Sequence, residues 1–424
     1  MKAAISRLGT TRVTRRDRVW KRTASTAAAF AVCVGVSAGV APQAHANGAS
    51  PKQWYLNALS AQQMWKVSTG KGVKIAVLDT GIDTSTSSLQ GQLLTGDIPK
   101  GVTYGATKDY DGHGTSMAEL IAGTGRGGGI KGLAPGAKII PIRVALSTLK
   151  DTAEFKRSPS PADAIRAAAD TDAQIINMSF GSFVPDDEEK AAVKYAASKG
   201  KLLIAGAGNG GGSDNEDFLG YPAAYPEVVG VGAADESGAV GEFSQSGDFI
   251  SLAAPGLDVP VWCDNTFQRY CKNRGTSQAS AIASAAAALV WSAHPEWTAN
   301  QVLRVLIDTA ARDWPKNTPS KYLGYGLIRP SANLLKGKGD PGPADVNPIT
   351  NEKTPAGAAG ATPSTSVPAS SQPPKSTSGG ETSAAGSSSE PSDGNTLWVV
   401  LGAVAAAAVI GGGGFAVLRA RRNG

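Results

Sequence analysis

Four polar side chains stand beside apolar segments of the sequence, in the order Asp79, His113, Asn209 and Ser277. A carboxylate, an imidazole and a hydroxyl are the groups with which a hydrolase activates a serine for nucleophilic attack. Each residue also has a simpler interpretation, because an aspartate can serve as a turn residue and a serine as a helix cap. Only their combination points to a catalytic site.

The chain contains three histidines, of which His113 is the best candidate for a proton-transferring base. It lies in Gly-His-Gly-Thr at 112–115, before the small and apolar run 117–122 that predicts a helix. A ring at a helix N-terminus faces the positive end of the helix dipole, so we expect it to be kept neutral. His45 falls in an expected signal peptide, and His294 after a predicted helix fits a capping or packing role.

Ser277 and Asn209 are placed to stabilise a developing negative charge. The run of small residues 277–293 predicts a tightly packed helix, with Ser277 at its exposed start beside unpaired backbone N–H groups. Asn209 follows another apolar run, where its amide would project from a turn flanked by Gly208 and Gly210. Donors of both kinds suit an oxyanion.

Five short apolar runs, each bounded by glycine, proline or polar residues, predict buried parallel strands. They are 73–78, 137–144, 174–178, 202–207 and 228–233. Helices are predicted at 161–169, 188–198, 277–293 and 300–310. This alternation predicts an α/β fold, a doubly wound and mostly parallel sheet with helices on both faces and chemistry at the carboxyl ends of its strands.

Together the candidate residues and their surroundings resemble the subtilisin family of serine proteases. The similarity covers residues 54–332 and rests on Val-Leu-Asp-Thr-Gly-Ile-Asp at 77–83, Gly-His-Gly-Thr at 112–115, Gly-Leu-Ala-Pro-Gly-Ala at 132–137, Ile-Asn-Met-Ser-Phe-Gly at 176–181, Tyr-Pro-Ala-Ala-Tyr-Pro at 221–226 and Gly-Thr-Ser at 275–277. The resemblance implies a subtilisin-like fold and a serine endopeptidase that hydrolyses peptide bonds.

The resemblance also implies a role for each candidate residue. Asp79, rather than Asp83, would orient His113, and His113 would take the proton of the Ser277 hydroxyl. The Asn209 amide and the Ser277 N–H would form the oxyanion hole.

The resemblance further implies a set of substrate-binding residues, namely Ser179, Phe180, Gly181, Gly208 and Gly220. The first three would pair with extended substrate backbone, and the last two would line the specificity pocket. We expect no cofactor and no metal site, since the acidic residues are scattered without a ligand-spaced cluster.

The net charge of +6 is concentrated at the two chain ends, so it predicts no nucleic-acid partner. Residues 1–22 carry +7 and the last six residues carry +3, which leaves −4 for the rest. The basic start, the apolar stretch 23–40 and Ala44-His45-Ala46 predict a signal peptide, residues 1–46. Arg15-Arg16 loosely fits a twin-arginine signal, but export by the general secretory route is the preferred interpretation.

A second apolar segment, near the C-terminus, predicts a membrane anchor. Residues 397–418 carry no charge and, at 1.5 Å per residue, are long enough to cross about 30 Å of hydrocarbon. The arginines that follow predict a cytoplasmic tail at 419–424 and an extracytoplasmic catalytic domain. We therefore expect a single-pass cell-membrane protein with a transmembrane helix at 396–418; a buried core helix is the alternative.

Between these ends we expect a peptidase domain at 47–335 and a disordered linker at 336–395. The linker is rich in Pro, Ser, Gly and Thr, so it buries too little apolar surface to offset the entropy of ordering. Signal cleavage leaves two cysteines, Cys263 and Cys271, and an even pair in an oxidising compartment predicts a disulfide. Two free buried thiols are the alternative.

Several of these features are similar to those of the mycosins, the membrane-anchored subtilases associated with type VII secretion. They are the segments 54–56 and 61–65, the cysteine pair, the proline-rich linker and the anchor. Only 32 residues, Asn47 to Leu78, lie between the expected signal peptide and Asp79, too few for a folded inhibitory propeptide. We expect polypeptide substrates, membrane attachment and association with the type VII secretion membrane complex. The alternative is a structural component of a secretion apparatus in which proteolysis is dispensable.

Overall fold

The structure, a computed structural model, describes residues 53–146, 150, 152–212 and 219–354. The chain divides into two units, Met1–Pro363 and Ser364–Gly424, and the second lies entirely outside the described residues. The predicted signal peptide, transmembrane helix and tail, with residues 355–395 of the predicted linker, also lie outside them. Within the described part, no helix is both long enough and apolar enough to span a bilayer.

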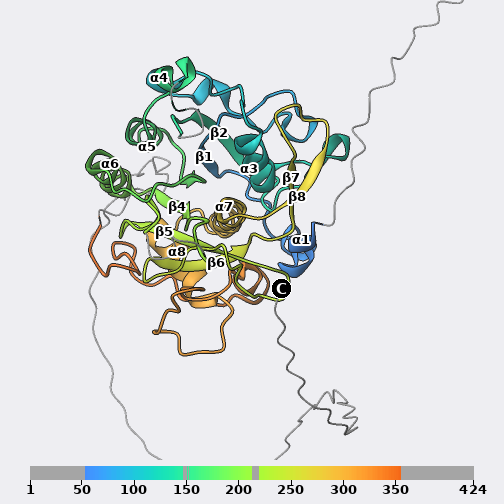
Figure 1. The fold of residues 1–424 in the computed structure, drawn as a ribbon. Helices are drawn as coiled ribbons and strands as arrows, with labels where there is room; N and C mark the ends of the chain where they lie inside the picture. The colour runs from blue at the N-terminus through green and yellow to red at the C-terminus, as the bar shows by residue number, and fades with distance from the viewer. Residues whose placement is uncertain (1–52, 147–149, 151, 213–218, 355–424) are drawn as a thin grey trace, which may run out of the picture. The chain divides into compact units, whose positions relative to one another are not determined.

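A six-stranded parallel sheet organises the first unit (Figure 1), in the order β2-β1-β3-β4-β5-β6. Its strands are β1 (Lys74–Asp79), β2 (Lys138–Arg143), β3 (Ile175–Met178), β4 (Leu202–Gly206), β5 (Val228–Ala234) and β6 (Ile250–Pro255). The five predicted strands are confirmed as β1 to β5, with ends that differ by at most one residue.

Alternate side chains of the strands enter two separate cores, one on each face of the sheet. In β1, Ile75 and Val77 pack with helices α3 and α7, whereas Ala76 and Leu78 pack with helices α5 and α6. The helices are α3 (His113–Ala122), α5 (Pro161–Ala169), α6 (Asp187–Ser198), α7 (Thr276–Ala293) and α8 (Ala299–Thr309), which packs on the α7 side. The predicted doubly wound arrangement is thereby confirmed.

Helix α7 is buried along most of its length because its side chains are small. A close approach at its start requires a glycine in the sheet. A Cβ on Gly206, the last residue of β4, would lie 2.8 Å from the Thr276 carbonyl oxygen, closer than real Cβ atoms come to such an oxygen. Gly206 therefore lets the first turn of α7 rest on the carboxyl end of β4.

The carboxyl ends of β1, β3 and β4 are neighbours at one edge of the sheet. Strand β1 lies between β2 and β3, so the direction in which the chain adds strands reverses there. Parallel sheets commonly bind ligands in the crevice at such a reversal. Asp79 ends β1, Met178 ends β3 and Gly206 ends β4, so the segments that follow them meet at this edge.

Some elements have no counterpart in the sequence prediction. Strand β6 contains Ser251 and Pro255, which interrupt its apolar pattern, and the hairpin of β7 (Val259–Trp262) and β8 (Tyr270–Asn273) includes an exposed polar strand. Helices of four to seven residues are too short to show a helical period: α1 (Trp54–Ala58), α2 (Ala61–Met64), α4 (Ala153–Arg157) and α9 (Pro330–Lys336). Four short 3₁₀ turns complete the described elements: Ser87–Leu89, Thr95–Asp97, Lys100–Val102 and Arg126–Gly128.

Residues 337–354 differ from the linker prediction, because they pack against α8. Thr298 Oγ1 and Asn300 Nδ2 donate to the Ala344 carbonyl at 2.8 and 3.0 Å, and Arg304 Nη2 donates to the Val346 carbonyl at 2.8 Å. The prediction of disorder from composition is wrong for this part. Its order comes from polar side chains on α8 that bind backbone carbonyls, and these partners do not show in the composition of the segment itself.

The β7–β8 hairpin carries a disulfide between Cys263 and Cys271, as the cysteine count predicts. Its closed loop reaches the segment before α3, where Asn265 Nδ2 donates to the Tyr110 carbonyl at 2.7 Å. A Cβ on Gly112 would lie 2.8 Å from the Asp264 carbonyl oxygen, so the two segments touch. The cross-linked hairpin therefore rests on the loop that precedes His113.

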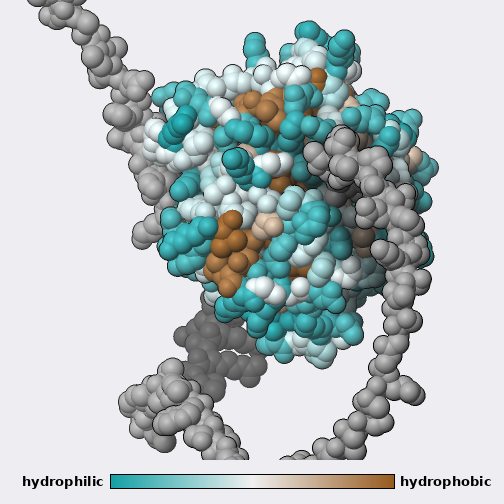
Figure 2. All heavy atoms as spheres, turned by 180° about the vertical axis from the view of Figure 1, so that it is seen from behind, coloured by the Kyte–Doolittle hydropathy of each residue, from teal (hydrophilic) through white to brown (hydrophobic). Residues whose placement is uncertain are grey.

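Hydrophilic residues cover most of the face opposite to that of Figure 1, and hydrophobic residues reach it only in separate patches (Figure 2). Over the described surface as a whole, the most exposed large hydrophobic side chains are Val184, Tyr322 and Val67. Val184 lies shortly after β3, close in sequence to the segment 179–181 for which substrate pairing is expected.

Candidate active site

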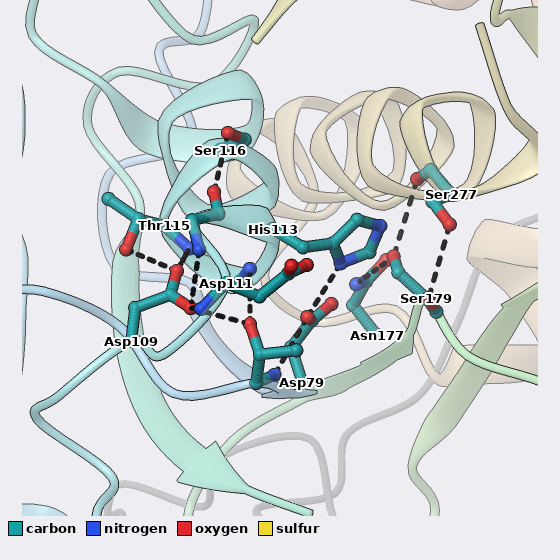
Figure 3. Close-up of polar contacts among 12 residues, drawn as sticks. Asp79, Asp109, Asp111, His113, Thr115, Ser116, Asn177, Ser179 and Ser277 are labelled. Atoms are coloured by element: carbon teal, nitrogen blue, oxygen red, sulfur yellow. Dashed lines mark hydrogen bonds and ion pairs between the residues drawn. The ribbon is translucent and has the colours of Figure 1, made fainter. Parts of the chain in front are cut away.

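The side chains of Asp79, His113 and Ser277 come together at the carboxyl edge of the sheet, from β1, α3 and α7 respectively (Figure 3). Figure 3 shows the His113 ring between the other two, with one nitrogen turned to Asp79 and the other on the side of Ser277. Three residues far apart in the sequence thus lie close together, because the elements that carry them meet at β1, where the order of the strands reverses.

Asp79 and His113 form a short hydrogen bond, with Nδ1 of the ring 2.7 Å from Oδ1 of the carboxylate. Asp79 is completely buried, and the same oxygen accepts the Thr80 N–H at 2.8 Å. Gly114 makes the contact possible, since a Cβ there would lie 2.2 Å from the Gly81 carbonyl oxygen. The start of α3 can therefore approach the end of β1 closely enough for the ring to reach the carboxylate.

The charge of Asp79 decides the protonation of His113. Burial lowers the pKa of the ring, but the Asp79 carboxylate, through its charge and its hydrogen bond, raises the pKa above the ordinary 6.5. The expectation that the helix dipole keeps the ring neutral is therefore wrong in direction. A full carboxylate charge at hydrogen-bond distance outweighs the partial charge of a helix terminus.

Asp109 organises the loop that leads into α3 and was not among the residues predicted from the sequence. Its Oδ1 accepts the Thr80 hydroxyl at 2.7 Å and the N–H groups of Asp111 and Gly112, while Oδ2 accepts both the N–H and the hydroxyl of Thr115 at 2.8 and 2.7 Å. Thr80 in turn accepts the Gly114 N–H at 2.9 Å. One buried carboxylate thus joins the end of β1 to the first turn of α3, and only its place four residues before His113 could have drawn attention to it.

Ser277 lies in the first turn of α7, and its hydroxyl donates to the Ser179 carbonyl at 3.1 Å. In the part of the chain that the structure describes, no hydrogen bond joins this hydroxyl to the His113 ring. The Ser179 hydroxyl holds the same turn, because it donates to the Ser277 carbonyl at 3.3 Å and lies 3.0 Å from the Ser280 hydroxyl. The side-chain amide of Asn177 in turn donates a hydrogen bond from Nδ2 to the Ser179 hydroxyl oxygen at 2.9 Å.

Asn209 is fixed by its side-chain carbonyl, and its amide nitrogen has no hydrogen-bond partner within the described part of the chain. Oδ1 accepts the N–H of Thr276 at 2.9 Å and its hydroxyl at 3.1 Å. Asn209 and Ser277 line one cavity of about 170 Å³. The Ser277 N–H belongs to the first turn of a helix, where backbone N–H groups have no partner within the helix. The cavity therefore has two donors of the kind that an oxyanion requires.

The predicted substrate-binding residues border this same cavity, which is lined by Ser179, Phe180, Gly181, Gly208 and Gly220 together with neighbouring residues. Ser182, next in the chain, exchanges two backbone hydrogen bonds of 2.8 Å with Tyr221. In the described residues, Phe180 and Gly181 have no backbone hydrogen bond, so their N–H and C=O groups can pair with an added strand.

Asp83 and His294 form no hydrogen bond with the side chains of Asp79, His113 or Ser277 in the described structure. Asp83 binds Ser85 through its carboxylate, and its own N–H donates to Thr115 at 2.9 Å, with no contact to the ring of His113 in the described part. His294 stacks on Trp297 with ring centroids 3.7 Å apart, which confirms its packing role. No group of three or more metal-ligating side chains occurs among the described residues.

Comparison with protein families matches residues 70–326 to the subtilase family of S8 peptidases. The chain belongs to this family of serine endopeptidases. Among curated relatives, the subtilase is 37% identical to the major intracellular serine protease of Bacillus subtilis (strain 168) over 246 residues, which are 57% of this chain and 75% of the relative.

Two solved structures with a similar fold are MycP3, a protease from a type VII secretion system, and MycP1. MycP3, from the ESX-3 system, has 30% identity and a TM-score of 0.53, over 66% of this subtilase and 87% of MycP3. MycP1 from Mycobacterium smegmatis has 27% identity and a TM-score of 0.56, over 68% of this subtilase and 86% of MycP1. The predicted subtilisin-like fold is confirmed, and the chain has mycosin proteases among its structural neighbours.

We predict that Asp109→Asn lowers the free energy of unfolding by about 1.5–3 kcal/mol, because an amide NH₂ would replace a charged acceptor that faces only donors. Turnover of a fluorogenic peptide should fall as well, since the loop before His113 loses its anchor. Urea denaturation and kcat/KM measure the two effects, with the exposed Asp248→Asn as the control. Unchanged stability of the Asp109 variant would show that the loop does not depend on this carboxylate.

Proposed function

We propose that the subtilase hydrolyses peptide bonds with Asp79, His113 and Ser277 as its catalytic triad and Asn209 in its oxyanion hole. The observation that carries the proposal is the hydrogen bond between the completely buried Asp79 carboxylate and the partly buried His113 ring, which is placed between Asp79 and Ser277 (Figure 3). Membership of the subtilase family supports a serine endopeptidase activity, and the geometry supports these residues for it.

The reaction begins with a rotation of the Ser277 side chain, which moves Oγ from the Ser179 carbonyl toward the second ring nitrogen of His113, Nε2. Oγ then attacks the carbonyl carbon of the scissile bond while Nε2 takes the hydroxyl proton. Asp79 holds Nδ1–H and stabilises the positive ring that forms. The carbonyl oxygen becomes an oxyanion, which accepts hydrogen bonds from the Asn209 amide and the Ser277 N–H.

Collapse of this intermediate breaks the carbon–nitrogen bond, and His113 gives its proton to the leaving amine. Water then attacks the carbonyl carbon of the acyl-enzyme while His113 takes one of its protons. When this second intermediate collapses, His113 returns the proton to Ser277 Oγ and the carboxylic acid product leaves. Phe180 and Gly181 would hold the substrate as an added strand, and the cavity beside Asn209 would receive the side chain before the scissile bond.

We further propose that this activity is extracytoplasmic, membrane-anchored and associated with type VII secretion. The predicted signal peptide at 1–46 and the predicted helix at 396–418 support export and anchoring. The likeness to MycP3 from the ESX-3 system and to MycP1, a component of the ESX-1 system, supports the association with secretion. The alternative, a structural component with dispensable proteolysis, would need the fold but not the hydroxyl of Ser277.

We predict that a labelled fluorophosphonate bonds covalently to the purified protein, and that Ser277→Ala abolishes the labelling. Ser182→Ala is the matched control, because Ser182 borders the same cavity without contacting His113 or Asp79 in the described structure. Gel fluorescence and peptide mapping locate the adduct. Labelling that persists in Ser277→Ala would reject Ser277 as the nucleophile.

The rate at limiting substrate should rise with pH, with a midpoint above 6.5, because His113 accepts a proton only when neutral and Asp79 raises its pKa. Asp79→Asn removes the cause of the shift, so the midpoint should move to lower pH, and kcat should fall by about 10⁴. Profiles of kcat/KM between pH 5 and 10 test this, with Asp83→Asn as the control. A midpoint that Asp79→Asn leaves in place would contradict the assignment.

The secretion proposal predicts that Ser277→Ala fails to restore type VII secretion to cells that lack the gene, although the variant stays in the membrane fraction. Immunoblotting measures the amount of secreted substrate in the medium and the amount of the variant in the membrane fraction. Normal secretion with Ser277→Ala, but not without the protein, would favour the structural alternative instead.

A further inference from the structure

A second cavity, of about 310 Å³, borders the same substrate-pairing segment and also His113. It shares Ser179, Phe180 and Gly181 with the smaller cavity at Ser277. A peptide that pairs with this segment while its scissile bond lies at Ser277 must therefore place other side chains at the larger cavity. Side chains of an extended strand point alternately to its two sides, so only the side chains at some positions of the peptide can enter the larger cavity.

Glu189 lines this cavity and is the unusual residue in it. Only 5% of the residue is exposed, and its Oε1 is buried without a hydrogen-bond partner in the described structure. Buried carboxylates are ordinarily paired or hydrogen-bonded, because an unpaired buried charge is costly. Burial first, and then the nearby charge of Asp186, raise the pKa of Glu189 to about 7.

The position of Glu189 at the start of α6 does not explain it. A glutamate three residues after a helix cap commonly binds the backbone N–H of the capping residue. Here the cap is Asp186, whose Oδ1 accepts the Glu189 N–H at 2.7 Å. The N–H of Asp186 is already bound to the Tyr225 hydroxyl, at 3.0 Å. The carboxylate is thus left without the partner that its helix position would supply.

The other walls of the cavity suit a long side chain with a positive end. Asp111 is a second carboxylate at the cavity, and no lysine or arginine lines it in the described part. Leu146, Phe180 and Tyr221 give it apolar walls. Lysine and arginine bury their methylene chains along such surfaces while their charged groups reach polar partners. A cation beside Glu189 would also offset the cost of burying the carboxylate.

We propose that Glu189 selects substrates with a lysine or arginine at one of the three positions P2 to P4, the second to fourth residues before the cleaved bond. The carboxylate would accept the charged group, and the apolar walls would contact the methylene chain. This specificity rests on the proposed peptidase function, so its test must separate the two.

The test measures cleavage of fluorogenic peptide libraries in which P2, P3 or P4 in turn is arginine, lysine or norleucine. Assays run at pH 8.5, where the Glu189 carboxylate is ionised. The wild-type protein should prefer the basic residues at one position, and Glu189→Gln should lower the ratio of kcat/KM for basic over norleucine peptides by about 10- to 100-fold. Glu188→Gln removes the same charge from an exposed neighbour on α6 and should leave the ratio unchanged.

Fluorophosphonate labelling of Ser277 in every variant reports an intact catalytic site independently of specificity. Glu189→Leu, which also removes the charge, should give the same loss if Glu189→Gln folds poorly. Labelled wild-type protein with no basic preference at P2 to P4, or a preference that both Glu189 variants retain, would overturn the proposal while the peptidase function stands. Absence of labelling in the wild-type protein would reject both.

Discussion

The candidate active site depends on one hydrogen bond, between the completely buried carboxylate of Asp79 and the partly buried ring of His113. It requires a charged group at the end of a buried strand and a helix that starts almost in contact with that strand. Gly114 permits this approach, because any larger residue would collide with the Gly81 carbonyl. Asp109 then fixes the loop before the ring by accepting five hydrogen bonds, from Thr80, Asp111, Gly112 and Thr115. The charge of Asp79 also sets the basicity of His113.

A second close approach places the other half of the site. Helix α7 crosses the sheet on side chains small enough to bring its first turn onto β4, where Gly206 leaves room for Thr276. Thr276 then holds the Asn209 carbonyl, and Ser179 holds the turn that carries Ser277. The two close approaches meet at the carboxyl edge of the sheet, so the rigid sheet, rather than any single loop, sets the distances between the groups.

The sequence allowed five strands and the main helices to be predicted, because buried parallel strands are short apolar runs. It also singled out the four candidate residues, because Asp79 and Asn209 are polar residues next to such runs. It did not reveal Asp109 or Asn177, whose importance lies in partners distant along the chain. Strand β8 and the ordered structure of residues 337–354 were not predicted, because both are stabilised by contacts with other segments of the chain. The direction in which the pKa of His113 shifts could not be predicted without its distance to Asp79. In the sequence, Glu189 resembles an ordinary glutamate in the first turn of a helix, and only the structure shows its burial and its unpartnered Oε1.

The most direct test of this account is the proton NMR signal of Hδ1 on His113, observed in protein with ¹⁵N-labelled histidine. A proton held between the ring and a buried carboxylate is strongly deshielded and protected from exchange. The wild-type protein should show one such resonance, coupled to a histidine nitrogen. It should disappear in Asp79→Asn and persist in Asp83→Asn. A spectrum without this resonance, or one in which Asp79→Asn leaves it unchanged, would contradict the central role of the Asp79–His113 bond.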